Sequence, residues 1–483
     1  MLPISGNTCL ARGVIREYRP YTMKRITILG AGTTGLVAAY LAARAGWDVT
    51  LVEATKDMGG MLGTTATAGD PIERFPQYFS TGDREVLWLI KDLGLDDRVF
   101  FSKAAHGVFC DDKTYPLSGM LDLLGFQPLR LLERLRLLGA GLMLSRIDNW
   151  KLFEGRSAIP WLNDWVGADV TERFIAPFLQ ARYGNFGNQL SVAWLAGRLR
   201  DKLCLLSPAT RNLGYLLGSF ETLTQALTED LCRKGARVVK NAAVVKFIES
   251  RGELVGFELN DGSRHDAKKV LATVPTRILA GLCPDNFKSY ASSLSKINYL
   301  GLLSVLISTR EPVSELHTTH IVSKDIPFTN MTAHTAIVDP ARYAGRHTVQ
   351  LQRFYSHSDP IASMDPDSLA DLGVSALRRI APDFDHSHVL DAEAFKIDYA
   401  AVCPDLNFSG LIPQVATPIA GLYIANTSHT YPDEPTISNC VRIAAKALEV
   451  IGVPHEVPLS RGAAAQVGFG SSLPLQATRP FVQ

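Results

Sequence analysis

Three glycines near the start of the chain, Gly30, Gly32 and Gly35, have the spacing G-x-G-x-x-G. An apolar segment precedes them, and an amphipathic helical pattern, a second apolar segment and the acidic residue Glu53 follow. This order is typical of a dinucleotide-binding βαβ unit, because the glycines allow a tight turn close to a pyrophosphate and the helix offers free N–H groups to the phosphates. The segment therefore predicts a parallel α/β sheet, with Glu53 placed to accept both hydroxyls of an adenosine ribose.

A second glycine pair, Gly59 and Gly60, follows Glu53 after a short loop. Such a pair lets another loop touch the same pyrophosphate, and it resembles the extension of flavoproteins of the glutathione reductase and amine oxidase type. Nicotinamide dehydrogenases usually lack it, so FAD is the expected cofactor. Those flavoproteins often have arginine after the pair, where this chain has Met61. The other residues expected to bind the cofactor in this region are Thr33, Thr34, Ala54 and Leu62.

Composition excludes several classes of protein. The 483-residue chain has a net charge of +1, which gives no bulk electrostatic argument for nucleic-acid binding. Its seven cysteines include no C-x-x-C pair, and no histidine cluster has metal-ligand spacing. We therefore expect no metal site, no disulfide framework and a cytoplasmic location. No apolar run is long enough to predict a transmembrane helix.

Cofactor-binding patterns recur in two later parts of the chain. Residues 214–275 have a helix, strand and hairpin pattern that includes Val245. A strand, a loop and a helix of small residues follow much later, and they contain Asn426, Thr436 and Ser438. Cofactor contacts from three separated segments imply a discontinuous cofactor domain with inserted segments.

These patterns divide the chain into two domains and two terminal segments. The predicted FAD-binding domain comprises residues 23–100, 205–280 and 396–456. The predicted substrate domain comprises residues 101–204 and 281–395. The predicted terminal segments are an N-terminal extension, residues 1–22, and a flexible tail, residues 457–483.

The three segments together resemble the FAD-dependent amine oxidase superfamily. That group includes monoamine oxidases, protoporphyrinogen oxidases, phytoene-type desaturases and, more distantly, UDP-galactopyranose mutases. In the first insertion, Pro177-Phe178, Tyr183-Gly184 and Leu190-Ser191 resemble the protoporphyrinogen oxidase branch. The resemblance implies a FAD/NAD(P)-binding Rossmann-like domain of the glutathione reductase type with an inserted α+β substrate domain.

The resemblance also implies roles for the later cofactor segments. Val245 would lay its backbone against the adenine, and Asn426 would hydrogen-bond the ribityl or phosphate region. The helix that opens near Thr436 and Ser438 would place N–H groups and its positive dipole near flavin N1 and O2. Asn426 and Ser438 stand where the family often has an acid and a glycine, so these contacts are weaker than usual in this chain.

Three residues are expected near the reacting atoms. Gln77 follows the first cofactor segment, and His429 and Tyr431 lie in the loop before the last helix. His429 could act near neutral pH as a base or polar anchor, or it could be a loop histidine in solvent. The leading hypothesis is an FAD-dependent oxidoreductase that oxidises or desaturates a small organic, isoprenoid or sugar-linked substrate by hydride transfer to flavin N5.

Two other functions stay open at this point. A UDP-galactopyranose mutase-like isomerase would use reduced flavin without net oxidation, and it would need a basic pocket for a nucleotide diphosphate. A non-catalytic flavin-binding protein would hold FAD that no physiological donor reduces. The departures from the family pattern at Met61, Asn426 and Ser438 are the only support for this second alternative.

Residues 128–146 form a candidate amphipathic helix. Leu131, Leu135, Leu138 and Leu142 recur at helical spacing, with three arginines among them. Such a helix could rest on a membrane surface as a peripheral contact and admit a lipophilic substrate. The alternative is an ordinary substrate-domain helix packed on the core. The sequence does not indicate an oligomeric state.

Overall fold

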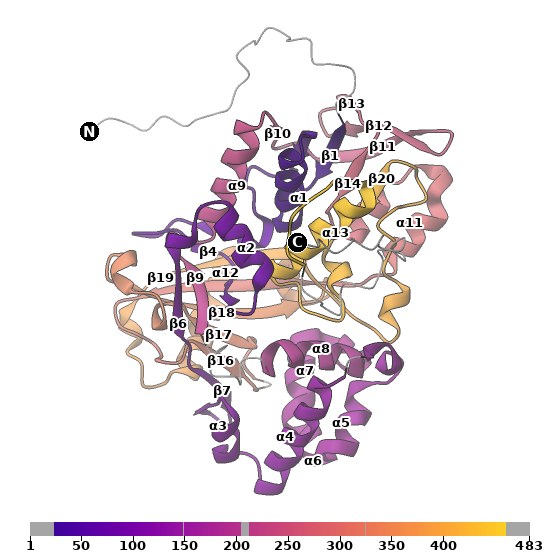
Figure 1. Cartoon of the computed structure of the whole chain (residues 1–483). Helices are drawn as coiled ribbons and strands as arrows, with labels where there is room; N and C mark the ends of the chain where they lie inside the picture. Colours follow the sequence, from indigo (N-terminus) through magenta and orange to yellow (C-terminus); the bar gives the residue numbers. More distant parts are fainter. Residues whose placement is uncertain (1–23, 148, 204–211, 324, 460–483) are drawn as a thin grey trace, which may run out of the picture.

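The computed structural model describes residues 24–147, 149–203, 212–323 and 325–459 (Figure 1). The predicted N-terminal extension and nearly all of the predicted tail, residues 460–483, lie outside the described residues. In Figure 1 one sheet with its helices occupies the upper part of the molecule, a second sheet crosses the middle, and a group of helices lies below.

The upper sheet is parallel and has five strands. Their order is β10 (Arg237–Val239), β2 (Asp48–Val52), β1 (Arg25–Leu29), β14 (Val270–Ala272) and β20 (Leu422–Ile424). In β1, Leu29 pairs with Val52 on one side and Ala272 on the other. The central first strand and the parallel neighbours confirm the predicted α/β class, with the strands of all three cofactor segments in one sheet.

Helices cover one face of this sheet and an antiparallel meander covers the other. The helices are α1 (Thr33–Arg44), α9 (Glu221–Arg233) and α13 (Ile437–Ile451); the meander strands are β11 (Val244–Ser250), β12 (Glu253–Leu259) and β13 (Arg264–Asp266). Ile28 is buried in the cluster with the helices, whereas Leu29 is buried with the meander. Because β1 is covered on both faces, its sequence is almost continuously apolar.

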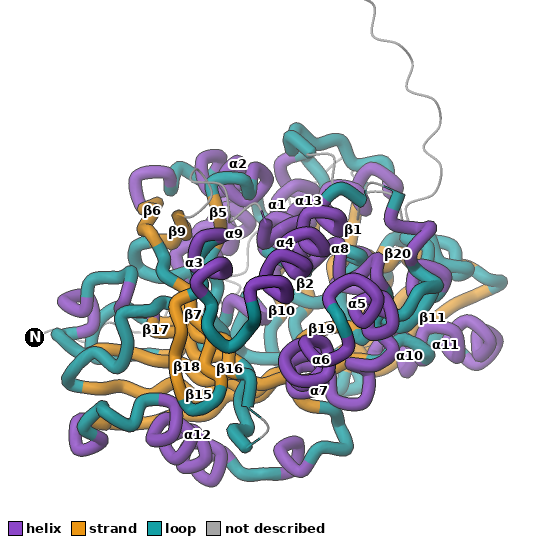
Figure 2. The backbone as a smooth tube through the Cα atoms, turned by 90° about the horizontal axis from the view of Figure 1, so that it is seen from below, coloured by secondary structure: helices purple, strands orange, loops and turns teal. Residues whose placement is uncertain are grey.

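The second sheet has seven strands of mixed direction. Their order is β19 (Val389–Val402), β15 (Tyr299–Thr309), β18 (His347–Tyr355), β17 (Asn330–Ala333), β16 (Thr318–Ile321), β7 (His106–Cys110) and β8 (Lys113–Pro116). Figure 2 shows α12 (Pro366–Ile380) on one side of β15 and β18, opposite the helices of the first insertion. The sheet therefore has one face against α12 and one face toward those helices.

The first insertion is mainly helical. It contains α3 (Met120–Gly125), α4 (Leu131–Ser145), α5 (Ala158–Val166), α6 (Ala168–Val170), α7 (Ala176–Tyr183) and α8 (Val192–Leu203). These helices share a buried cluster with β15 residues and with Tyr431 of the last cofactor segment. A helical group beside a mixed sheet confirms the expected α+β substrate domain.

Two predicted domain boundaries fall inside regular elements. β19 pairs with β15 from Val389 to Val402, so the predicted boundary at 396 falls within a strand of the substrate sheet. The boundary at 100/101 divides β6 (Val99–Lys103), which pairs with β9 (Asn212–Leu216). Strand pairing joins residues from different parts of the chain, which local sequence patterns do not report.

Short elements complete the described structure. They are β3 (Thr64–Thr65), β4 (Ile72–Glu73), β5 (Phe79–Ser80), α2 (Arg84–Asp92), α10 (Thr276–Leu282) and α11 (Lys288–Ser295). β5 pairs with β9, which brings the segment after the second glycine pair against the start of the second cofactor segment. This pairing matters for the site, because residues 73–78 lie between the two domains.

Candidate active site

The first glycine loop has the geometry that a bound pyrophosphate requires. Gly30 adopts a φ of +96°, which favours glycine. A Cβ on Gly35 would lie 1.9 Å from the carbonyl oxygen of Gly30, so only glycine lets α1 pack this close to β1. A Cβ on Gly32 would meet nothing within 4 Å, which leaves open space at the N-terminus of α1. Thr33 and Thr34 form the first turn of that helix.

The second glycine pair lies directly against the first loop. The amide of Gly59 donates to the carbonyl of Ala31 at 2.8 Å, and a Cβ on Gly60 would lie 3.1 Å from the Cα of Gly32. Gly59 and Gly60 have φ values of +104° and +60°. The two glycine segments therefore meet where the predicted diphosphate would bind.

The residues that flank the second pair differ in what they expose. Met61 lines the large cavity described below, whereas the side chain of Leu62 is buried in the core of the cofactor domain. Only the backbone of Leu62 could therefore face a ligand. Ala54 is exposed beside Glu53.

Glu53 lies at the end of β2, next to the first glycine loop. Its Oε2 accepts the amide of Ala31 at 2.7 Å, and its Oε1 accepts the amide and hydroxyl of Thr55, each at 2.9 Å. These bonds hold the carboxylate in a fixed orientation, and Oε2, which accepts one bond, has a second lone pair for another donor. The position fits the predicted contact with ribose hydroxyls.

Val245 lies at an irregularity in the meander. The register of β11 against β12 shifts between Val244 and Lys246, so Val245 is left outside the regular ladder. Its side chain is 45% exposed. A bulge leaves backbone groups unpaired, which makes this residue suitable for the predicted backbone contact with adenine.

The last cofactor segment differs from the prediction in its side chains. The amide oxygen of Asn426 accepts from Ser428, and its amide nitrogen donates to the carbonyl of Val274 at 2.7 Å. Asn426 thus joins its own loop to the segment after β14, and the expected side-chain bond to the ribityl or phosphate region stays a prediction. Its short amide caps a turn here, which is a frequent role of asparagine.

Ser438 is also engaged inside the protein. Its hydroxyl donates to Glu85 Oε2 at 3.0 Å, and Arg442 donates to Oε1 of the same carboxylate at 3.0 Å. The Ser438 hydroxyl is therefore engaged by the buried ion pair between α2 and α13, and the contact with the flavin through the backbone at the helix N-terminus stays a prediction. Thr436 caps α13 by accepting the amide of Asn439 at 3.2 Å, and it lines the large cavity.

One large cavity, of about 810 Å³, lies between the cofactor domain and the substrate domain. Met61 and Thr436 bring two cofactor segments to its wall. Most of the remaining wall is apolar and comes from the substrate domain. Examples are Leu137, Leu138, Leu144, Phe174, Phe178 and Ala400. An apolar space of this size that meets the cofactor segments is the expected form of a site for a lipophilic substrate.

The three predicted catalytic residues have different positions. Gln77 lines the cavity. His429 is fully buried, its ring lies against the backbone of Asn426 and Pro413, and burial lowers its pKa to about 4. Tyr431 is buried beside Trp150 and its hydroxyl lies 3.1 Å from that of Ser191. His429 and Tyr431 are not among the residues that line the cavity, so the structure gives no support to their predicted role at the reacting atoms, and that role stays a prediction.

A group of polar residues on the cavity wall was not predicted. Its members lie on the substrate sheet: His106 on β7, His320 on β16 and Asn330 on β17, with His317 directly before β16. Thr318, next to His317, pairs with His106 across β16 and β7, although more than 200 residues separate them in sequence. No local motif could have joined these residues, because only the sheet pairing brings them together.

His317 differs from the other polar groups of the wall. It is 1% exposed, burial lowers its pKa to about 3, and its Nε2 atom has no hydrogen-bond partner among the described residues. A neutral imidazole with an unused nitrogen can donate or accept one hydrogen bond to a ligand. In the described part of the chain, no group of three or more His, Cys, Asp or Glu side chains could hold a metal ion.

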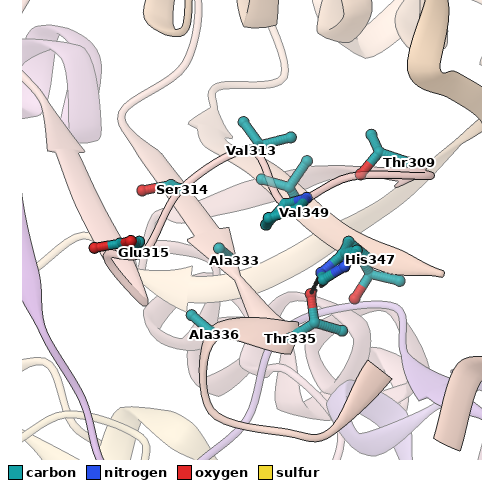
Figure 3. Close-up of a pocket in the computed structure, with 11 residues that line it drawn as sticks. Thr309, Val313, Ser314, Glu315, Ala333, Thr335, Ala336, His347 and Val349 are labelled. Atoms are coloured by element: carbon teal, nitrogen blue, oxygen red, sulfur yellow. Dashed lines mark hydrogen bonds between the residues drawn. The ribbon is translucent and has the colours of Figure 1, made fainter. Parts of the chain in front are cut away.

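Two smaller pockets lie in the substrate domain. The one in Figure 3, of about 220 Å³, is lined by residues such as Val313, Ala333 and Val349, and its only drawn polar contact joins Thr335 and His347 at 3.3 Å. The other, of about 360 Å³, shares Arg353 and Phe354 with the large cavity. Neither is lined by a residue of the three cofactor segments, whereas Met61 and Thr436 line the large cavity, which is therefore the candidate active site.

Helix α4 forms one wall of the cavity and also reaches the surface. Leu137, Leu138 and Leu144 line the cavity. Leu131 and Leu135 are 61% and 51% exposed. The predicted amphipathic helix is therefore present, with one side toward the cavity and another in solvent. Among the described residues, no helix is both long and apolar enough to cross a bilayer.

Comparison with known proteins places this geometry in a family. Coproporphyrinogen III oxidase from Bacillus subtilis is 26% identical over 290 residues, which cover 54% of this chain and 61% of the Bacillus protein. The matched region thus spans less than two thirds of the length of the Bacillus protein. An oxidoreductase from Methanosarcina mazei superposes with a TM-score of 0.70 at 16% identity over 88% of this chain and all of that one. Reduced UDP-galactopyranose mutase superposes with a TM-score of 0.69 at 14% identity over 90% and 95% of the two chains.

These structural likenesses, at such low identity, show the fold alone. The model of the family "Flavin containing amine oxidoreductase" matches residues 33–433, which is most of the chain. The match includes the first turn of α1, the second glycine pair and the substrate domain. The chain belongs to the flavin-containing amine oxidoreductases.

Proposed function

We propose that this protein binds FAD and oxidises a lipophilic organic substrate in the large cavity. Bound FAD would supply a hydride acceptor at flavin N5. The residues present fit the adenosine diphosphate half of the cofactor. Gly32 leaves open space for the diphosphate, and the fixed carboxylate of Glu53 suits the ribose. The bulge at Val245 suits the adenine. Thr436 at the N-cap of α13 suits the flavin end, because the helix N-terminus favours negative charge.

The cavity lining carries the proposal for the substrate. Its wall is predominantly leucine, phenylalanine and other apolar side chains, and its two arginines are both paired. Arg198 forms a salt bridge with Glu434, and Arg353 forms one with Asp359. An apolar ring system or an isoprenoid suits this space better than a sugar-linked substrate does, because burial of apolar surface supplies most of the binding energy.

Within the site, the chain's own residues would bind and orient the substrate. The apolar wall excludes water from the reacting bond, which strengthens the polar contacts that remain. Gln77, Asn330 and the unused nitrogen of His317 offer directed hydrogen bonds on an otherwise apolar surface. Such a small number of polar groups fixes the orientation of a ligand in a hydrophobic pocket.

The isomerase alternative has weaker support. A nucleotide diphosphate needs unpaired positive charge, and both arginines of the cavity already face carboxylates. Fold likeness to the mutase is shared with oxidoreductases of the same superfamily. The non-catalytic alternative loses part of its support, because Asn426 and Ser438 have structural roles that explain why they are present.

We also propose peripheral membrane contact through residues 128–146. Leu131, Leu132 and Leu135 are each more than half exposed at the start of α4, and Leu121 of α3 is 83% exposed. Exposed arginines, including Arg136, accompany them. Exposed leucines beside basic residues are typical of a helix that lies in the interface of an anionic membrane. Because α4 also lines the cavity, a lipophilic substrate could enter from the bilayer.

The test uses purified protein reconstituted with FAD under anaerobic conditions. Coproporphyrinogen III and protoporphyrinogen IX are the first substrates to add, since a relative is a coproporphyrinogen III oxidase. Rapid bleaching of the flavin absorbance by either compound supports the proposal. Bleaching by NADPH alone, followed by conversion of a nucleotide sugar, would support the isomerase instead. Bound FAD that no organic donor reduces would support the non-catalytic alternative.

A further inference from the structure

Three polar side chains lie side by side on the sheet that forms one wall of the cavity. His320 on β16 is directly opposite Asn330 on β17, and Asn330 is directly opposite Gln352 on β18. Directly opposed residues on antiparallel strands project from the same face of the sheet, with Cβ atoms about 5 Å apart. All three residues line the large cavity, and we call them the polar row.

The polar row belongs to one face of the sheet, and the opposite face is apolar. Ile321, Met331 and Leu351, each adjacent in sequence to a member of the row, are buried in the hydrophobic cluster that includes α12 residues. Successive residues of a strand point to opposite faces, so the row points away from this cluster. The row therefore faces the cavity, and the core beneath it holds its three strands in place.

The amide of Asn330 has a fixed orientation. Its oxygen, Oδ1, lies 2.6 Å from Nδ1 of His320. An amide oxygen can only accept, so His320 Nδ1 is the donor of this bond. The ring of Phe178 lies edge-on against the His320 ring, with ring centres 5.8 Å apart. In the described part of the chain, no protein group accepts from the NH2 group of Asn330, so its two N–H donors are left for another partner.

Two glutamines on the same face of β18 differ in how their amides are used. Gln350 is 1% exposed, and its amide nitrogen donates to the backbone carbonyl of Glu73 at 2.8 Å. Gln352 lies two residues further along the strand and is half-buried. Within the described residues, no protein group hydrogen-bonds to the Gln352 amide. Gln350 thus holds the cofactor domain against the sheet, whereas Gln352 faces space that a ligand can fill.

We propose that Asn330 and Gln352 select the substrate by binding a neutral acceptor oxygen, such as a carbonyl oxygen, on an otherwise apolar molecule. This inference rests on the proposed function, because it concerns the substrate of the same cavity. The NH2 group of Asn330 donates one hydrogen bond to this oxygen, and the amide of Gln352 donates another. A carbonyl oxygen has two lone pairs, so it accepts both bonds.

Charge decides between a carbonyl oxygen and a carboxylate. Asn330 and Gln352 are uncharged, and the two arginines of the cavity already face carboxylates. A carboxylate moved from water into this cavity would lose its hydration without gaining a free positive charge, which makes its burial costly. A neutral carbonyl group loses less hydration, and the two amide hydrogen bonds replace what it loses.

The opposite wall determines the rest of the substrate. Helix α4 presents Leu137, Leu138 and Leu144 to the cavity, and Gly141 leaves room among them because a Cβ there would meet nothing within 4 Å. An apolar ring system can therefore lie against α4 while its carbonyl oxygen lies at the polar row. A pure hydrocarbon would fill the same space but leave both amides without partners, and this penalty makes polar groups selective.

The first test compares two rigid probes that differ in one carbonyl group. Fluorenone carries this group, and fluorene has a methylene group in its place. Equilibrium dialysis against the full chain, reconstituted with FAD, measures the affinity for each probe. The wild type should bind fluorenone about tenfold more tightly than fluorene, because only fluorenone supplies an acceptor to the two amides.

Two variants remove the donors in different ways. Asn330→Asp keeps the oxygen that accepts from His320 and replaces the NH2 group with a second acceptor oxygen. Gln352→Met replaces the amide with an apolar group of similar size. In each variant the preference for fluorenone should fall to about threefold or less, while the affinity for fluorene stays within about twofold of wild type. The variants alter different strands, so poor folding of one does not prevent a decision.

The matched control is Gln225→Met, which removes an exposed amide on α9 that bonds to Glu221 and does not line the cavity. It should keep the wild-type preference for fluorenone. Equal affinities of the wild type for the two probes would overturn the proposal, and so would a preference that persists in both variants. Tighter binding of a fluorene carboxylate than of fluorenone would contradict the assignment of a neutral oxygen.

A second measurement reports the hydrogen bonds themselves. The carbonyl stretching frequency of bound fluorenone, read from infrared difference spectra, should be lower than in a hydrocarbon solvent, because hydrogen bonds weaken the C=O bond. Asn330→Asp should return it toward the hydrocarbon value, and an unshifted frequency in the wild type would contradict the proposal. Neither measurement needs flavin reduction. If no organic donor bleaches the flavin, the proposed function fails, and the dialysis and infrared results still decide whether the polar row binds a carbonyl oxygen.

Discussion

The glycine loops and the substrate cavity are built in opposite ways. The glycine loops present backbone atoms to the proposed cofactor site, and their residues lie within about one βαβ unit of sequence, from Gly30 to Gly60. The cavity is built from side chains of helices and strands that range from Met61 to Thr436. A cofactor common to a whole family can be held by backbone geometry, whereas a substrate particular to one enzyme is selected by side chains.

This contrast implies different responses to mutation. A side chain added at Gly35 should disrupt both the fold and the cofactor site, because the backbone itself is displaced. A change in the cavity wall or at its entrance should alter substrate or membrane contacts and leave the cofactor domain intact. The following predictions test this division, in order of decreasing effect.

The largest effect is expected for Gly35→Ala. The new methyl group would lie 1.9 Å from the carbonyl oxygen of Gly30, so β1 and α1 must separate. We expect loss of FAD retention and a destabilisation of at least about 3 kcal/mol, comparable to severe overpacking. Flavin content after gel filtration and urea unfolding would measure both. Gly281→Ala is the control, since a Cβ there meets nothing within 4 Å, and it should retain the cofactor.

The next effect concerns Glu73, at the junction of the two regions. Its pKa is raised from 4.5 to about 7 in the folded protein, so between these values the folded state holds a proton that the unfolded state has lost. Stability therefore falls as pH rises through this interval, by about 3 kcal/mol at about 1.4 kcal/mol per pKa unit. Urea unfolding of wild type from pH 4.5 to pH 8 should show this decline, and Glu73→Gln should show a correspondingly smaller one. Identical pH dependence of stability in both proteins would contradict the raised pKa of Glu73.

A smaller effect is expected at the outer face of α4. The double variant Leu131→Ser, Leu135→Ser removes two exposed leucines and should reduce binding to anionic vesicles by about 2 kcal/mol, or roughly thirtyfold. Cosedimentation with vesicles that contain phosphatidylglycerol measures this. Leu390→Ser, an exposed leucine on β19, is the control and should bind as wild type does. Wild-type protein that never sediments with vesicles would remove the proposed membrane contact.

The smallest effect is expected for Ser438→Ala. The variant loses the hydrogen bond to Glu85 and should be destabilised by about 1 kcal/mol. Its affinity for FAD should stay within about twofold of wild type, because the hydroxyl faces the ion pair with Arg442 rather than the open space of the site. Fluorescence titration of the apoprotein with FAD would check this. A tenfold loss of affinity would restore the role predicted from sequence.

The sequence was most informative where function depends on local backbone geometry. The spacing of Gly30, Gly32 and Gly35, the acid at Glu53 and the pair Gly59-Gly60 each specify a short segment, and the structure places these segments together. For Asn426 and Ser438 the motif marks a position of the backbone and carries no information on the side chains, which hydrogen-bond to Val274 and Glu85.

The cavity wall and the buried contacts behind it could not be predicted in the same way. His106 and His317 meet through β7–β16 pairing, and His334 joins Tyr78 across 256 residues. A lone histidine or tyrosine in a strand carries no local signal, because its environment depends on the pairing of distant segments. The same reason explains why the candidate His429 proved to be a buried structural residue.

The most direct test of the account is an anaerobic absorbance spectrum of the FAD-reconstituted protein before and after addition of coproporphyrinogen III. We expect oxidised-flavin bands that are retained through gel filtration and are bleached by this organic donor. A protein that retains no flavin when FAD is supplied in excess would contradict the assigned cofactor site, and with it the proposed oxidation in the adjoining cavity.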